Sequence, residues 1–183
     1  SLGKKSWMTE TSGEKSDWLF PKNSYPNNGA WSIALKIHQA LTIGMQSAWL
    51  YWTFVDSNDD GTVSDYGLTN QQFGASSPKF NAVKHYYKFI RPGMVRIDNK
   101  VAGNANILSS AYLDQDSSSL CCVLLNTSSS RQQIELNLPS GYRSDNMTEY
   151  TSSDGNYFLN KTLDLTNGKV LLDFPAYSVK TIT

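Results

Sequence analysis

A short apolar run ends in a carboxylate near the start of the chain, in the segment WMTE at residues 7–10. Residues 6–9 are a strand candidate, and a buried strand that stops at a Glu is a common way to hold one acid at the rim of a pocket. The loop that follows carries Trp18 and Tyr25, which could flank a cleft beside Glu10. The alternative from these residues alone is a surface Glu at a strand end, with the loop rings packed for structure.

Other side chains that could act as catalytic groups or metal ligands have simpler interpretations. His38 falls on a predicted helix, where we expect it to be exposed or to cap the helix rather than to be catalytic. Four carboxylates follow residue 55, but their spacing fits no EF-hand loop, so we interpret them as solvated loop carboxylates. They are Asp56, Asp59, Asp60 and Asp65. We therefore expect no metal and no cofactor.

Charge and composition exclude two classes of partner. Lys+Arg and Asp+Glu number 16 each, and the pI is about 6.7. The chain has no basic field for nucleic acid and no apolar run of the ~18 residues that a membrane span needs. Cys121 and Cys122 are neighbours that point to opposite faces of a strand, so we predict two core residues rather than a disulfide. The triplets N-x-[ST] at Asn126, Asn146 and Asn160 agree with a secreted, extracellular protein, although such triplets also arise by chance.

The first half of the sequence alternates strand and helix patterns. The strand candidate at residues 6–9 precedes a helical stripe at residues 31–43, for which Gly44 is a natural stop. Residues 47–55 are a nearly unbroken apolar and aromatic run, as in strands buried on both faces. A polar loop and a second predicted helix at residues 78–90 complete an order that is typical of a β/α barrel or a doubly wound sheet.

The second half has the pattern of short antiparallel strands. Residues 134–138 alternate apolar and polar side chains, as in a half-buried strand. Further strands are predicted at residues 95–97, 107–113, 120–125, 147–150, 170–174 and 179–182. Turn residues such as those at 167–168 separate them, which indicates a β-sandwich. The fold prediction is mixed: an α/β domain over residues 1–91 and an all-β domain over residues 92–183.

Four segments resemble the C-terminal half of glycoside hydrolase family 30, especially its xylanases. They are WMTE at residues 7–10, KIHQALTIG at 36–44 running into AWLYW at 48–52, FIRPGMVRID at 89–98 and LDFPAYSVKT at 172–181. The resemblance covers essentially the whole chain. It implies that the first domain holds the last two β/α units of a (β/α)8 catalytic barrel and that the second is an antiparallel β-sandwich side domain. The family's sandwich can also borrow a strand from the N-terminus of the full protein, which would leave one edge here unpaired.

The resemblance further implies a retaining mechanism, with Glu10 at the position of the catalytic nucleophile. It places Trp52 at the floor of the subsite for the cleaved sugar, where the alternative is a core Trp. Glucuronate-reading xylanases of the family carry arginines directly after the strand that ends near Trp52. Here that place reads TFVD, residues 53–56, which cannot form a bidentate pair with a carboxylate. Neutral xylan, or another β-linked glycan, is therefore the expected substrate.

The resemblance also leaves the catalytic apparatus incomplete. A barrel of this type needs ~250 residues, and the family's acid/base residue has no counterpart in this sequence. We therefore expect this chain to be the C-terminal portion of a retaining endo-hydrolase that acts on β-linked plant cell-wall polysaccharide, with xylan as the first candidate substrate. We expect the chain to be inactive alone. Its uncovered apolar faces should bind a missing N-terminal barrel segment or drive self-association. One alternative is a non-catalytic carbohydrate-binding protein or module, and another is a sandwich that only braces a barrel.

Overall fold

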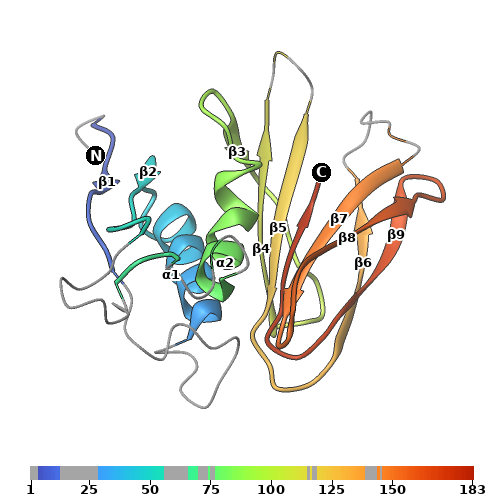
Figure 1. Cartoon of the computed structure of the whole chain (residues 1–183). Coiled ribbons are helices and arrows are strands. Elements are labelled where there is room, and N and C mark those ends of the chain that lie inside the picture. The colour runs from blue at the N-terminus through green and yellow to red at the C-terminus, as the bar shows by residue number, and fades with distance from the viewer. Residues whose placement is uncertain are drawn as a thin grey trace. The chain divides into compact units, whose positions relative to one another are not determined.

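The computed structural model describes residues 4–12, 29–55, 66–69, 74, 77–114, 116, 119–138, 144 and 146–183 (Figure 1). The chain divides into two compact units, Ser1–Lys84 and His85–Thr183. The helices are α1 (Ala30–Thr42) and α2 (Pro78–Tyr87), and the strands are β1 (Trp7–Met8), β2 (Ala48–Trp49), β3 (Val95–Ile97), β4 (Ile107–Leu113), β5 (Leu120–Asn126), β6 (Gln132–Asn137), β7 (Asn146–Ser153), β8 (Asn156–Asp164), β9 (Lys169–Phe174) and β10 (Val179–Ile182). No helix in the described ranges is long and apolar enough to cross a membrane.

In the first unit, helix α1 connects two short parallel strands, β1 and β2. The predicted helix stop is confirmed: the N–H of Gly44 donates to the carbonyl oxygen of Gln39 at 2.9 Å, two residues beyond the helix end. A Cβ on residue 44 would lie 2.9 Å from the carbonyl oxygen of Ala40, so this close turn requires glycine. The expectation that His38 is exposed is wrong. Its side chain is buried because α1 is covered around most of its circumference.

The apolar run at residues 47–55 forms a shorter strand than predicted. β2 covers only two of its residues. Trp49 is buried, but Leu50 and Phe54 are exposed, so the prediction of a strand buried on both faces is wrong for this chain. The reason lies in the pairing. β2 has one partner strand, β1, among the described residues, and side chains on so small a sheet have little to pack against.

The second unit is sandwich-like and consists of two antiparallel sheets. The larger has the strand order β3-β4-β5-β10-β7-β8, and the smaller pairs β6 with β9. The predicted antiparallel strands of this half are confirmed. Strand β8 is not predicted by the sequence pattern. Tyr157, Phe158 and Leu159 follow one another without polar alternation, and only Leu163 on this edge strand is buried, so no period of two is visible.

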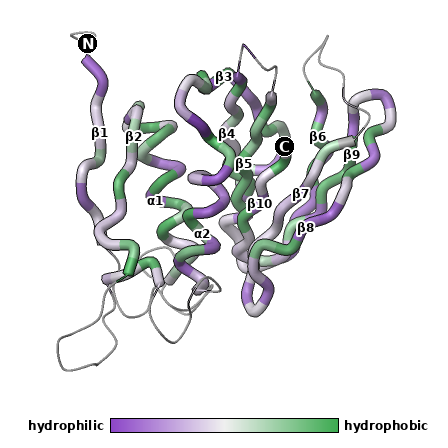
Figure 2. The backbone as a smooth tube through the Cα atoms, turned by 45° about the horizontal axis from the view of Figure 1, so that its top comes forward, coloured by the Kyte–Doolittle hydropathy of each residue, from purple (hydrophilic) through white to green (hydrophobic). Residues whose placement is uncertain are grey.

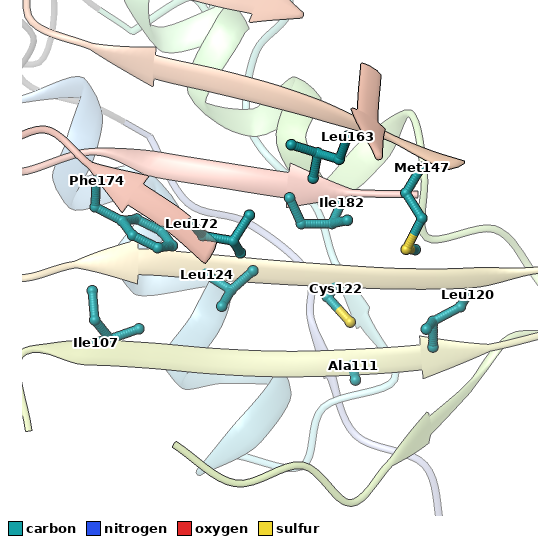
Figure 3. Packing of buried hydrophobic residues seen from close by; sticks show 10 residues of the cluster. All are labelled: Ile107, Ala111, Leu120, Cys122, Leu124, Met147, Leu163, Leu172, Phe174 and Ile182. Atoms are coloured by element: carbon teal, nitrogen blue, oxygen red, sulfur yellow. The ribbon is translucent and has the colours of Figure 1, made fainter. Parts of the chain in front are cut away.

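The core of this unit is formed by side chains from both sheets. β5 is hydrophobic along almost its whole length (Figure 2). It supplies Cys122 and Leu124 to the core, while Leu172 and Phe174 come from β9. The buried cluster in Figure 3 comprises Ile107, Ala111, Leu120, Cys122, Leu124, Met147, Leu163, Leu172, Phe174 and Ile182. Cys121 and Cys122 are free buried thiols, as predicted. Burial raises the pKa of Cys122 to about 12 and also raises that of Cys121, so both thiols stay protonated at neutral pH.

An Asn-Gly turn carries the chain from the larger sheet to the smaller one. Asn167 and Gly168 have φ values of 54° and 72°, the positive values that a type I′ turn needs. Thr166 and Lys169 exchange both backbone hydrogen bonds across the turn, at 3.0 and 3.1 Å. The turn predicted at this place is therefore confirmed, and β9 leaves it to pair with β6.

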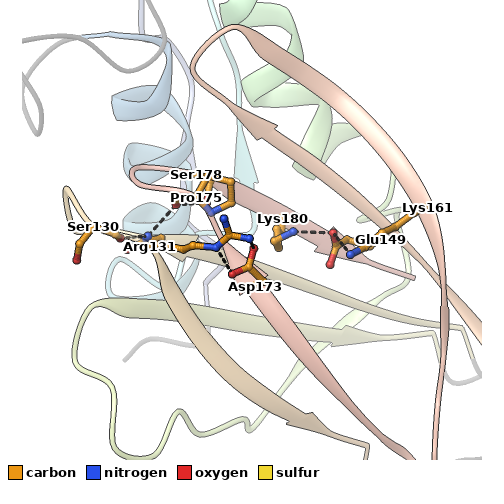
Figure 4. A network of polar contacts seen from close by, with 9 residues as sticks. Ser130, Arg131, Glu149, Lys161, Asp173, Pro175, Ser178 and Lys180 are labelled. Atoms are coloured by element: carbon orange, nitrogen blue, oxygen red, sulfur yellow. Dashed lines mark hydrogen bonds and ion pairs between the residues drawn. The ribbon is translucent and has the colours of Figure 1, made fainter.

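A charged network is buried in the second unit (Figure 4). Lys180 on β10 and Glu149 on β7 are only 2% and 3% exposed, and Lys180 Nζ donates to Glu149 Oε1 at 2.6 Å. Lys161 Nζ on β8 lies 3.5 Å from the same oxygen, and Lys180 also donates to Thr151 Oγ1 at 2.7 Å. Burial lowers the pKa of Lys180, and the hydrogen bond to Glu149 opposes that shift. Glu149 Oε2 is buried without a hydrogen-bond partner in the described part of the chain.

Candidate active site

Backbone hydrogen bonds bring the ends of β1 and β2 to one edge. The N–H of Leu50 donates to the carbonyl oxygen of Met8 at 2.9 Å. Beyond the strands, the N–H of Trp52 donates to the carbonyl oxygen of Thr11 at 2.7 Å. Because β1 and β2 are parallel, the segments that follow them leave the strand pair in the same direction. Glu10 directly precedes Thr11. It therefore lies on a segment next to that of Trp52, at the same edge of the strand pair.

Glu10 is exposed and has no ion-pair partner among the described residues. It is also the one carboxylate side chain in the described part of the first unit, at residues 4–12, 29–55, 66–69, 74 and 77–84. A retaining glycosidase needs two carboxyl groups about 5–5.5 Å apart. The described part of this unit can therefore supply one member of such a pair, and the other would have to come from elsewhere.

Trp52 lies beside a second aromatic ring that sequence reasoning missed. Trp52 and Tyr66 are 52% and 53% exposed, and their ring centroids are 6.2 Å apart at an interplanar angle of 56°. Together they present two rings at the edge where Glu10 lies. The available signal was a lone tyrosine in a loop that is otherwise rich in Asp, Ser and Gly. That composition is typical of a solvated loop, and it does not predict that Tyr66 lies against Trp52.

The chain segment around Tyr66 is fixed by contacts within the same unit. The N–H of Leu68 donates to the carbonyl oxygen of Thr53, the residue after Trp52, at 2.8 Å. Phe54 packs edge-on against Phe80 of α2, with ring centroids 5.6 Å apart. These contacts hold the backbone on both sides of the Trp52 and Tyr66 pair, and two held rings form a firmer surface for a ligand than rings on a free loop.

Several predicted residues cannot be placed in this site. Trp18 and Tyr25 lie outside the described residues, as do the four loop carboxylates Asp56, Asp59, Asp60 and Asp65. Among the residues that are described, no group of three or more His, Cys, Asp or Glu side chains could hold a metal ion. The described site therefore rests on Glu10, Trp52 and Tyr66.

The second unit contains a groove of about 690 Å³ at the open side of its core. Its lining includes the core residues Ala111, Cys122 and Leu124 and residues 133–137 of β6. None of its lining residues is aromatic. Sugar rings bind by packing their C–H faces on aromatic rings, so this groove has the character of an incompletely covered core rather than that of a glycan site.

A family model and several solved structures match glycoside hydrolase family 30. Residues 93–182 match the glycosyl hydrolase family 30 beta sandwich domain. The chain is 29% identical over 187 residues to the glucuronoxylanase XynC of Bacillus subtilis strain 168, with 98% of this chain and 39% of the relative covered. The xylanase Xyn30A of Clostridium acetobutylicum, of family 30 subfamily 8, superposes with a TM-score of 0.76 at 25% identity, with 98% of this chain and 42% of that one covered.

A further solved structure supports the same fold. The catalytic domain of the family 30 xylanase C from Talaromyces cellulolyticus superposes with a TM-score of 0.79 at 24% identity, and the match covers 100% of this chain and 41% of that chain. The chain thus spans about two fifths of the length of each of these proteins. Both units, and not the sandwich-like unit alone, lie within the matched length.

Proposed function

Because this chain belongs to glycoside hydrolase family 30 and matches the C-terminal part of its members, we propose that it supplies the nucleophile side of a retaining active site. The substrate would be a β-linked plant cell-wall polysaccharide, with xylan first. One observation carries the proposal: the parallel pairing of β1 with β2 puts Glu10 and Trp52 at one edge. Active sites of β/α barrels lie at that edge of the strands.

In this proposal β1 and β2 are the last two strands of a (β/α)8 barrel, and α1 and α2 are the helices that follow them. Residues 1–91 would be the catalytic part and residues 92–183 the β-sandwich side domain. The part of the family's enzymes that this chain does not span would bring the other barrel strands and the acid/base carboxyl. It would also cover side chains such as Trp7 and Phe54, which are exposed here. Without it, the same apolar surface would drive self-association.

The proposed reaction proceeds through a covalent intermediate. The carboxylate of Glu10 attacks the anomeric carbon and forms a glycosyl ester, while the acid/base carboxyl protonates the leaving oxygen. The same carboxyl then activates a water molecule that hydrolyses the ester. The exposure of Glu10 supports this role, because a nucleophile must be accessible to the anomeric carbon.

The substrate would pack on Trp52, with Trp18 and Tyr25 as further candidates in the loop after Glu10. The relative from Bacillus subtilis is a glucuronoxylanase. Residues 53–56 of this chain contain no Arg, so they cannot pair bidentately with a glucuronate carboxylate. We therefore propose neutral xylan, cleaved outside the cell. A structure of an exported protein from Bacteroides fragilis shares the fold, with a TM-score of 0.71.

A second candidate function is glycan binding without cleavage. The two exposed rings of Trp52 and Tyr66 favour it, as does the presence of a single carboxylate in the described part of the first unit. Both candidate functions use the surface of Trp52 and Tyr66, but only hydrolysis requires a second carboxyl group. Binding by this chain would support both of them, whereas hydrolysis after addition of the missing barrel part would support only the enzyme.

Trp52→Ala is expected to weaken binding of soluble xylan to the chain about tenfold, or ~1.4 kcal/mol, because the sugar loses the apolar face on which it packs. Affinity electrophoresis in gels with and without xylan measures this as lost retardation. Tyr87→Ala is the matched control, since Tyr87 is also an exposed ring but lies at the end of α2. Equal retardation of Trp52→Ala and the parent chain would contradict the role of Trp52.

A further inference from the structure

The structure separates the three N-x-[ST] triplets of this chain, which the sequence alone cannot rank. Asn126 begins the triplet NTS, Asn146 begins NMT and Asn160 begins NKT. An N-linked glycan requires that the side-chain amide of the Asn is free to carry a large, hydrated group on the surface. The described surroundings of Asn126 and Asn160 differ in this respect.

Asn126 cannot carry a glycan in the folded chain. The residue is 0% exposed. Its Nδ2 donates to the carbonyl oxygens of Ser130 and Pro175, both at 2.8 Å, and its Oδ1 accepts from the N–H of Ser128 at 2.9 Å. The amide thus joins the loop after β5 to the segment before β10. A sugar on Nδ2 would remove a donor from this buried arrangement and would have no room.

Asn160 has the opposite surroundings. It lies in β8, an edge strand of the six-stranded sheet, and both Asn160 and Thr162 are exposed. Its cross-strand partner in β7 is Tyr150. Asn160 therefore offers an accessible side-chain amide, and Thr162 supplies the required hydroxyl two positions later. Pairing with β7 fixes the strand on which both residues lie.

We propose that Asn160 is an N-glycosylation site, used when the chain passes through a secretory pathway that transfers oligosaccharide from a polyprenyl-diphosphate donor. The amide nitrogen of Asn160 forms a bond to C1 of the sugar, the bond from C1 to the diphosphate oxygen breaks, and the amide loses one proton. The lipid diphosphate leaves with the bonding electrons. The proposal stands on burial and hydrogen bonding in the second unit and does not depend on the proposed hydrolase function.

A glycan at this position would have a physical effect on the sheet edge. An edge strand presents unpaired N–H and C=O groups to which another chain can pair. β8 also exposes an apolar side chain, Leu159, which is 56% exposed. A bulky hydrated oligosaccharide on Asn160 would block such edge pairing, so the glycan would keep the second unit from associating through β8.

The test is secretion of the full chain from yeast, followed by peptide mass analysis before and after release of N-glycans by an amidase. We use an Asn146→Gln background so that only Asn126 and Asn160 can be occupied. The soluble chain should carry glycan at Asn160 and none at Asn126. Thr162→Ala should remove the glycan while Asn160 stays in place, and Thr162→Ser should keep it.

Two results would overturn the proposal. One is soluble secreted chain with Asn160 unmodified, in a culture where a secreted control protein is glycosylated. The other is soluble chain with glycan at Asn126, since the arrangement of Asn126 with Ser128, Ser130 and Pro175 leaves no place for it. Glycan at Asn160 that Thr162→Ala removes would establish the site.

Discussion

Replacing Glu10 by Gln is expected to abolish hydrolysis in a barrel completed with the N-terminal part of a family 30 xylanase. Gln keeps the size and the hydrogen-bonding shape of the side chain but loses the charge, and an amide cannot form the glycosyl ester of a retaining mechanism. Loss of an essential catalytic group lowers kcat by on the order of 10⁴-fold or more in other enzymes. The effect should fall on kcat, with KM largely kept, because ring packing on Trp52 does not use that charge. Reducing-sugar release from neutral xylan measures both constants.

The matched control is Glu135→Gln on β6. Glu135 is also an exposed carboxylate, but it lies in the second unit, where it accepts a hydrogen bond from Lys169 Nζ at 3.1 Å. This variant should keep its activity. Activity of the Glu10→Gln enzyme close to that of the parent would show that Glu10 is not the nucleophile, whatever the assembled barrel can do.

The second large effect concerns stability. Glu149→Leu should lower the free energy of unfolding of the second unit by about 3–5 kcal/mol, the cost of leaving one charge of a buried pair without its partner. Lys180 would lose the acceptor that lies 2.6 Å from its Nζ while remaining 2% exposed. The double variant Glu149→Leu/Lys180→Met should recover most of the loss, because an apolar pair of similar volume needs no solvation.

Urea unfolding followed by far-UV circular dichroism measures this effect. All five Trp residues lie before residue 85, so Trp fluorescence reports on the first unit and serves as an internal control. Lys161→Met is a milder comparison, because Lys161 is exposed and lies 3.5 Å from the same carboxylate. A double variant that is as unstable as Glu149→Leu would argue that shape, and not charge, makes the network necessary.

The sequence predicted the elements whose signals are local. Helix α1 and its stop at Gly44 follow from a helical stripe and a close turn, and the Asn167-Gly168 turn follows from the backbone that these residue types tolerate. Except for β8, the strands of the larger sheet could be predicted from short apolar or alternating runs, and this includes β3, which is mostly exposed. β8 could not, because it is an edge strand whose exposed residues carry no alternation.

The site was only partly predictable for a related reason. Glu10 and Trp52 stand at the ends of short strands, so the parallel pairing that brings them to one edge could be anticipated from the strand and helix order. Tyr66 could not, because its position beside Trp52 depends on the Leu68 hydrogen bond to Thr53 across a loop. The exposure of Leu50 also depends on which strands are present to cover it. A run of apolar residues in the sequence does not show which strands those are.

The most direct test of the central proposal is complementation. The chain is assayed for reducing-sugar release from neutral xylan alone, and then together with the N-terminal barrel part of a family 30 xylanase added as a separate polypeptide. The proposal predicts no hydrolysis by either polypeptide alone and hydrolysis by the mixture that is lost with Glu10→Gln. Hydrolysis by the chain alone that survives Glu10→Gln would contradict both the need for a second carboxyl from outside this chain and the assignment of the nucleophile.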